Sequence, residues 1–226
     1  MPAPQSSNKI SIEVSKTLGS VSANIHEVNK PVCVLMLAHG AGAGMDHPFM
    51  VTLASELGNR SVITIRYNFP FMENGKKRPD PPAIAEKTIE AVMNKAHSLY
   101  PKLPSFAAGK SFGGRMTSQR LSKNCPVFIR GIVFFGFPLH PAGAPAIGRA
   151  THLSTVKVPM LFLQGTKDAL ATMDLMEGVV KKLPLATLKK YEGADHSFKV
   201  PKKQMIDVLA EDTYRWITRI LSHEIL

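Results

Sequence analysis

Gly109-Lys110-Ser111-Phe112-Gly113-Gly114 lies between an apolar run that ends at Ala108 and a stretch of helix-forming residues. A Gly-x-Ser-x-Gly sequence between a strand and a helix predicts a tight, strained turn, because the glycines let the backbone crowd there without Cβ clashes. The serine hydroxyl then stands at the edge of a sheet. The same pattern also occurs in ordinary loops, so the rest of the chain must supply partners for the serine.

A base and an acid follow Ser111 in a suitable order. Asp168 is the first carboxylate after Ser111, and it follows the strand-like run 159–164. His196 lies in a loop before the last helix, whereas His223, the only later histidine, belongs to the polar end of that helix. We expect Ser111 to be a nucleophile, His196 its general base and Asp168 the acid that orients the imidazole.

Simpler roles exist for each of these residues alone. Asp168 fits a turn-capping aspartate, and His196 fits a histidine of a surface loop. Asp195 is a rival acid, but a residue next to the histidine is poorly placed to hold its ring, so we expect Asp195 to shape the loop. The joint occurrence of three such residues at the ends of three strands favours the catalytic interpretation.

A glycine-rich loop, His39-Gly40-Ala41-Gly42-Ala43-Gly44, follows the apolar run 31–38, which is typical of a strand buried on both faces. We expect the backbone N–H groups of Ala41 and Phe112 to form an oxyanion hole, which holds the negative oxygen of a tetrahedral intermediate. Asp46 is the expected N-cap of the next helix, with Pro48 in its first turn.

The same loop has a rival interpretation as a dinucleotide-binding loop. Met45 occupies a position at which the fingerprint requires a small residue, and the next strand ends in Arg66 rather than in an acid. Arg66 could meet the 2′-phosphate of NADP, which stays open as a minor alternative. We expect no organic cofactor and no metal.

Four motifs resemble the α/β-hydrolase superfamily: Ala38-His39-Gly40, the 109–115 turn, Gln164-Gly-Thr-Lys-Asp168 and Asp195-His196-Ser197. The segments 66–73 and 136–141 narrow the resemblance to a small, lidless, dienelactone-hydrolase-like group, which includes uncharacterised bacterial hydrolases and an animal testis-expressed hydrolase-like protein. The resemblance spans residues 31–220 and implies catalytic roles for Ser111, Asp168 and His196. Dienelactone hydrolases use a cysteine nucleophile, so lactone hydrolysis does not carry over to a chain with serine.

Strand and helix patterns alternate along the chain. An antiparallel hairpin is expected from 10–14 and 21–25, followed by strands near 32–38, 61–66, 104–109, 131–136, 159–164 and 186–191 and helices near 48–58, 83–98, 112–122, 172–182 and 202–222. This order predicts an α/β-hydrolase fold, a mostly parallel twisted sheet of seven or eight strands with helices on both faces. The 137–158 connection is too short for a lid domain.

Length and composition predict one domain over residues 1–226. Hydrophobic residues make up 44% and charged residues 20% of the chain, which is ordinary for a globular protein. Residues 1–9 are polar and are expected to be a flexible start rather than a signal peptide, and no apolar stretch approaches membrane-spanning length. Cys33 and Cys125 are expected to be reduced, so we predict a cytoplasmic location.

Basic residues near the expected site bear on the substrate. Arg66 and the run 76–78 flank the loop after the second central strand, and His140 follows another strand. Arg66 and the run 76–78 are expected to attract an anionic acyl compound, and Arg66 and His140 are candidate substrate contacts. The alternatives are a solvated basic loop for 76–78 and a structural hydrogen bond for His140.

The formal net charge of +11 raises the alternative of a nucleic-acid-binding protein. The basic residues are spread over many segments without a nucleic-acid motif or aromatic platform, so this is the weakest alternative. The other alternative to an enzyme is a catalytically silent scaffold protein with the same fold. We therefore predict a serine hydrolase that cleaves a small ester or thioester through an acyl-enzyme. The sequence does not fix the oligomeric state.

Overall fold

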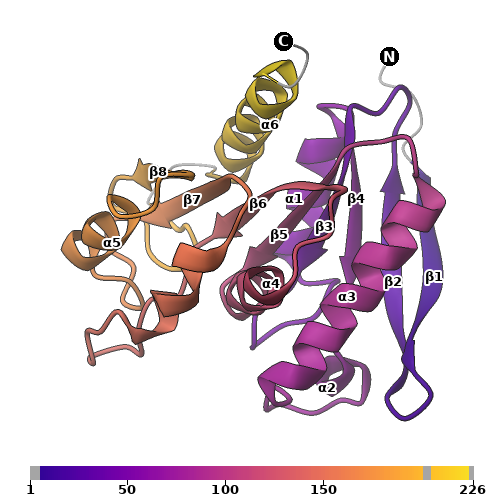
Figure 1. The fold of residues 1–226 in the computed structure, drawn as a ribbon, viewed down its shortest axis with the longest axis horizontal. Helices are drawn as coiled ribbons and strands as arrows, with labels where there is room; N and C mark the ends of the chain where they lie inside the picture. Colours follow the sequence, from indigo (N-terminus) through magenta and orange to yellow (C-terminus); the bar gives the residue numbers. More distant parts are fainter. Residues whose placement is uncertain (1–5, 201–204, 224–226) are drawn as a thin grey trace.

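The structure, a computed structural model, describes residues 6–200 and 205–223. One eight-stranded sheet runs through it in the order β1-β2-β4-β3-β5-β6-β7-β8 (Figure 1). β1 and β2 form an antiparallel hairpin, β2 pairs antiparallel with β4, and all other neighbours are parallel. The strands are β1 (Ser6–Ser15), β2 (Gly19–Glu27), β3 (Cys33–Ala38), β4 (Val62–Tyr67), β5 (Ser105–Lys110), β6 (Ile129–Phe135), β7 (Met160–Gly165) and β8 (Ala186–Tyr191).

Helices cover both faces of the sheet (Figure 1). They are α1 (Pro48–Gly58), α2 (Pro70–Glu73), α3 (Pro82–Leu99), α4 (Phe112–Lys123), α5 (Met173–Val180), α6 (Met205–His223) and the 3₁₀ helix η1 (Gly148–Thr155). Alternate residues of β3 enter two separate cores: Leu35 packs on the side of α1 and α6, and Met36 on the side of α3 and α4. The predicted fold class is confirmed.

The connection between β6 and β7 holds only η1, so no lid domain is inserted there. Neither η1 nor α2 was predicted. The four residues of α2 are too few to show a helical repeat, and η1 is a 3₁₀ helix, whose period of three residues per turn differs from the α-helical repeat. At the other end of the chain, β1 begins at Ser6, so the prediction of a flexible segment was wrong for residues 6–9. These polar residues pair with residues 24–27 of β2 as part of an edge strand. Residues 1–5 and the predicted helix start at 202–204 lie outside the described residues.

We expected Asp46 to be the N-cap of α1, but the structure has His47 in that position. The His47 Nδ1 atom accepts a hydrogen bond from the Phe49 backbone N–H at 3.2 Å, and Pro48 occupies the first helical position. Asp46 is exposed and pairs with Arg66 instead. The Asp46 carboxylate is therefore paired outside the helix, and the residue directly before Pro48 caps α1.

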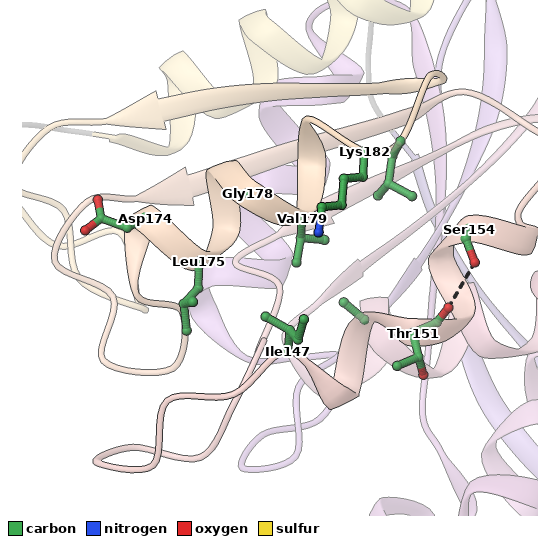
Figure 2. Close-up of a pocket in the computed structure, with 10 residues that line it drawn as sticks. Ile147, Thr151, Ser154, Asp174, Leu175, Gly178, Val179 and Lys182 are labelled. Atoms are coloured by element: carbon green, nitrogen blue, oxygen red, sulfur yellow. Dashed lines mark hydrogen bonds between the residues drawn. The ribbon is translucent and has the colours of Figure 1, made fainter.

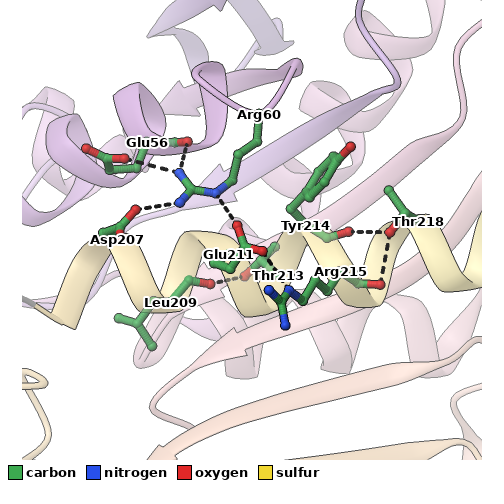
Figure 3. Close-up of polar contacts among 9 residues, drawn as sticks. All are labelled: Glu56, Arg60, Asp207, Leu209, Glu211, Thr213, Tyr214, Arg215 and Thr218. Carbon is green, nitrogen blue, oxygen red and sulfur yellow. Dashed lines mark hydrogen bonds and ion pairs between the residues drawn. The ribbon is translucent and has the colours of Figure 1, made fainter.

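Arg60, just after α1, joins α1 to α6. Its guanidinium contacts Glu56 at 3.1 Å, Asp207 at 2.5 Å and Glu211 at 2.9 Å (Figure 3). Asp207 and Glu211 lie in the first two turns of α6. The cluster therefore fixes the N-terminal part of α6 against α1, close to the cavity described below.

Both cysteines are free, as predicted: Cys33 is buried in β3, and Cys125 is partly buried after α4. No helix in the described part of the chain combines the length and apolar character that crossing a membrane requires.

Candidate active site

The candidate site lies where the order of the strands reverses. From β3 the chain moves outward to β4, and it later returns to the other side of β3 as β5. Loops that leave the carboxyl ends of β3 and β5 therefore diverge and open a crevice between them, which is the usual ligand position in such sheets. The glycine-rich loop follows β3, and Ser111 follows β5.

Ser111 stands in a strained turn between β5 and α4. Its φ of 50° and ψ of −116° are unusual for a residue with a side chain. A Cβ atom at Gly109 would lie 2.2 Å from the Gly114 nitrogen, and one at Gly113 would lie 2.5 Å from the His39 oxygen. The glycines are therefore required by the close approach of backbone segments, as the sequence indicated.

The structure brings Ser111, His196 and Asp168 together. The Ser111 Oγ atom lies 2.8 Å from His196 Nε2, and His196 Nδ1 lies 2.7 Å from Asp168 Oδ2. Because a carboxylate only accepts, Nδ1 carries the proton, and Nε2 is left to accept from the serine hydroxyl. Asp168 is buried, and its Oδ1 atom also accepts the Leu170 backbone N–H at 2.8 Å.

The loops after β7 and β8 are pressed against each other, which sets the aspartate and the histidine side by side. A Cβ atom at Gly165 would lie 2.3 Å from the Ala194 oxygen. Asp195 Oδ1 accepts the backbone N–H groups of Ser197 and Lys199, both at 2.8 Å. Asp195 thus shapes the histidine loop, as expected, and leaves the imidazole to Asp168.

Gln164 is a site residue that the sequence reasoning missed. Its amide nitrogen donates to Asp168 Oδ2 at 2.5 Å, and its amide oxygen accepts the Phe137 backbone N–H at 2.9 Å. Gln164 is fully buried and so connects Asp168 to the loop after β6. The signal was present in the sequence as one polar residue at the end of an apolar strand.

The Ala41 and Phe112 backbone N–H groups donate to no other group in the described residues; Ala41 lines the same cavity as Ser111, and Phe112 follows Ser111 in the chain. Phe112 is the first residue of α4, where backbone N–H groups have no partner within the helix. His39 fixes the other loop, since Nδ1 lies 2.7 Å from the Gly40 oxygen and Nε2 accepts the Phe69 backbone N–H at 3.0 Å. Burial lowers the pKa of His39 to about 4, so the ring is neutral.

A cavity of about 740 Å³ opens over these groups. Its polar floor is formed by the glycine-rich loop, Ser111 and His196. The rest of its wall is largely apolar, from Phe49, Met50, Leu170, Phe198, Val200, Met205 and Ile206. The ionisable side chains that line it besides His196 are His47, Lys110 and Lys199, and no carboxylate of the described residues lines it.

Residues 31–219 match the family described as "alpha/beta hydrolase domain". The chain belongs to this family. A dienelactone hydrolase from Anabaena variabilis is 20% identical, with a TM-score of 0.77 over 95% of this chain and 98% of that one. A lidless α/β serine hydrolase from Xanthomonas campestris is 17% identical, with a TM-score of 0.73 over 97% of both chains. Est1E from Butyrivibrio proteoclasticus, solved with ferulic acid bound, is 14% identical, with a TM-score of 0.75 over 94% of this chain and 99% of that one.

Two candidate substrate contacts of this α/β-hydrolase lie elsewhere. Arg66 is only 5% exposed and donates to the Met45 oxygen at 2.5 Å and to Asp46 Oδ1 at 3.3 Å. It does not line the cavity, so neither the substrate contact nor the contact with a 2′-phosphate is supported. The basic run 76–78 is exposed and also lies outside the cavity wall, in agreement with a solvated loop.

His140 is the other contact that the structure does not support. It is 2% exposed, and its Nε2 atom accepts the Thr172 backbone N–H at 2.9 Å, so Nδ1 donates to the Pro141 oxygen at 2.8 Å. Both ring nitrogens are therefore used inside the protein. The alternative of a structural hydrogen bond was right for His140.

A second cavity of about 340 Å³ lies between η1 and α5 (Figure 2). Ile147, Leu175 and Val179 form much of its wall, with Asp174 and Lys182 among the other residues that line it. Ser154 also lines it, but its hydroxyl donates to the Thr151 oxygen at 3.1 Å and has no histidine partner (Figure 2).

Proposed function

We propose that this α/β-hydrolase is a serine hydrolase that cleaves small carboxylic esters or thioesters through an acyl-enzyme at Ser111. The observation that carries the proposal is the pair of hydrogen bonds from Ser111 to His196 and from His196 to Asp168, 2.8 and 2.7 Å long, with Ser111 and His196 lining the larger cavity. Nucleophile, base and orienting acid then form one connected unit.

The chemistry follows from the atoms in place. Ser111 Oγ attacks the ester carbonyl carbon while its proton passes to His196 Nε2, and Asp168 stabilises the imidazolium. The Ala41 and Phe112 N–H groups hold the resulting oxyanion. Nε2 returns the proton to the leaving alcohol or thiol as the acyl-enzyme forms. Water then repeats the attack, which releases the acid and restores the serine.

The cavity wall supports an acyl compound with an apolar part and a negative charge. Its volume of about 740 Å³ falls in the range of small-molecule sites. Lys199 and His47 stand at this wall, and no carboxylate of the described residues opposes them. We therefore propose that Lys199 and His47, and not Arg66, contact a negatively charged group of the substrate.

The test is labelling with a fluorophosphonate probe, together with turnover of acetyl, butyryl, feruloyl and monosuccinyl esters and an acetyl thioester. We expect Ser111→Ala to abolish labelling and to lower kcat by about 10⁴- to 10⁶-fold, because the hydroxyl is the attacking group. Ser154→Ala, which also removes one serine hydroxyl at a cavity, is the control and should behave as wild type. Folded wild-type protein that neither reacts with the probe nor turns over any ester would instead favour a catalytically silent scaffold.

A further inference from the structure

Lys110 precedes Ser111 in the chain, and its ammonium nitrogen Nζ donates a hydrogen bond to the His196 backbone oxygen at 2.5 Å. The bond joins the end of β5 to the loop after β8, which are far apart in sequence. We propose that Lys110 is a positioning residue that ties the turn carrying Ser111 to the loop carrying His196 and so sets the distance from Ser111 Oγ to His196 Nε2. The inference rests on the function proposed above.

The two segments that Lys110 joins are both strained. Within the described residues, positive φ angles at residues other than glycine occur at Lys30, Ser61, Ser111 and Phe198. Two of these four positions flank the Lys110 contact, since Phe198 lies two residues after His196. Such backbone persists only where surrounding contacts hold it, and a short hydrogen bond from an ammonium is a contact of that kind.

Stability alone does not account for a lysine here. Its Nζ atom lies 5.5 Å from the centre of the Phe198 ring and 6.0 Å from that of Phe49. No carboxylate of the described residues lies within ion-pair distance of it. A charge held in such surroundings with one neutral acceptor is costly, and an apolar side chain of similar length would pack between the rings at lower cost.

Gly136 leaves the room that this arrangement needs. A Cβ atom there would lie 3.2 Å from Lys110 Nζ and 3.4 Å from both Cε1 and Nδ1 of the His196 ring. The ammonium and the imidazole therefore share one small space at the end of β6. A displacement of the lysine would move the His196 backbone oxygen and, with it, the ring that must receive the serine proton.

The pKa of Lys110 lies within the pH range in which ester turnover can be measured. Burial lowers its pKa from 10.5 to about 8, although the charges of Asp168 and Asp195 oppose this. Within the described residues, Asp168 and Asp195 are the charges that act on it, His196 lies across the Gly136 position, and His47 and Lys199 line the same cavity. From β6 and α1, Gly136 and Phe49 lie next to it and carry no charge. Above pH 8 the hydrogen bond to the His196 oxygen loses its charge and weakens, so kcat should fall.

The stability of the fold should change in the opposite direction over the same interval. Between about pH 8 and 10.5 the unfolded chain binds the Lys110 proton and the folded chain does not. The free energy of unfolding contributed by this group therefore rises with pH in that window and is flat below it. A lysine that only filled space would not couple falling kcat to rising stability.

The experiment compares wild type with Lys110→Met, Lys110→Arg and the exposed control Lys102→Met, with ester turnover and fluorophosphonate labelling measured from pH 6 to 10. We expect Lys110→Met to lower kcat by about 10- to 100-fold with KM nearly unchanged, no loss of thermal stability and no fall in kcat near pH 8. Lys110→Arg should recover part of kcat and also lack the fall, because arginine keeps its charge.

Three outcomes decide the matter. Wild-type kcat in folded Lys110→Met would overturn the inference while leaving the serine mechanism intact. Absence of labelling in wild type would remove the proposed function, and the inference with it. If Lys110→Met does not fold, a wild-type kcat that stays level from pH 7 to 9.5, or that falls equally in Lys110→Arg, would overturn it.

Discussion

The two cavities of this α/β-hydrolase differ in the kind of structure that surrounds them. The larger one is built on backbone turns: Ser111, Phe198 and Gly136 around it all have positive φ angles of 50 to 70°. The smaller one is formed between η1 and α5 (Figure 2), and none of its described lining residues has a positive φ angle. The larger cavity gathers groups that exchange protons, and the smaller one is lined mainly by side chains that pack.

The difference shows where strain is tolerated. Close backbone approaches at Gly109, Gly113 and Gly165 restrict each position to glycine and hold Ser111, Asp168 and His196 in register. The smaller cavity has no such restriction, since a Cβ atom at Gly178 would meet nothing within 4 Å. A cavity alone therefore says little about function, and the contacts that fix its lining say more.

The largest test of this comparison uses two acids: Asp168, which is buried behind His196 of the larger cavity, and Asp174, which lines the smaller one. Asp168→Asn removes the carboxylate that holds the His196 ring, and we expect kcat to fall by about 10⁴-fold because the wrong tautomer is favoured. Asp174→Asn, at the wall of the smaller cavity, is the matched control and should leave kcat unchanged. The measurement is single-turnover ester hydrolysis. A loss below about tenfold in Asp168→Asn would mean that another group orients His196.

A medium effect is expected at Gly136. Gly136→Ala adds a methyl group 3.2 Å from Lys110 Nζ and 3.4 Å from the His196 ring, at a φ of 70°. We expect kcat to fall by about tenfold or more, together with a loss of about 1 kcal/mol in the free energy of unfolding from the left-handed backbone. Urea denaturation and ester turnover measure the two effects.

Gly143→Ala is the matched control for Gly136→Ala, because it introduces the same backbone strain without a contact to neighbouring side chains. Gly143 has a φ of 73°, and nothing lies within 4 Å of its Cβ position. This variant should lose similar stability with unchanged kcat. Equal kcat values in the two variants would show that the space beside His196 has no catalytic importance.

The sequence predicted most of the fold because its strands and helices are long enough to show their periodicity. The 48–58 helix was predicted with the bounds that α1 has, and each strand was predicted within a few residues. α2 was missed because four residues show no repeat. The residues of β1 before Ile10 were missed because an edge strand can be polar along its length.

The candidate site could be predicted as far as chain order and strand ends decide it. Ser111, Asp168 and His196 follow three parallel strands, whose carboxyl ends meet at one edge of the sheet. Arg66 and His140 also lie at or after strand ends, yet their side chains are held by Met45 and Thr172. A sequence places a residue at an edge, whereas the direction and the partners of its side chain depend on packing.

The smallest expected effect concerns two helical glycines, one beside each cavity. Gly178→Ala in α5 should raise the free energy of unfolding by about 0.5 to 1 kcal/mol, because alanine is the better helix former and its Cβ atom meets open space. Ester turnover should not change. Gly113→Ala in α4 makes the same exchange, but its Cβ atom would lie 2.5 Å from the His39 oxygen, so we expect lower stability and lower kcat. Thermal denaturation of the two variants measures whether their stabilities change in opposite directions. If both alanines stabilise the protein, the backbone around Ser111 is less tightly held than the close approaches imply.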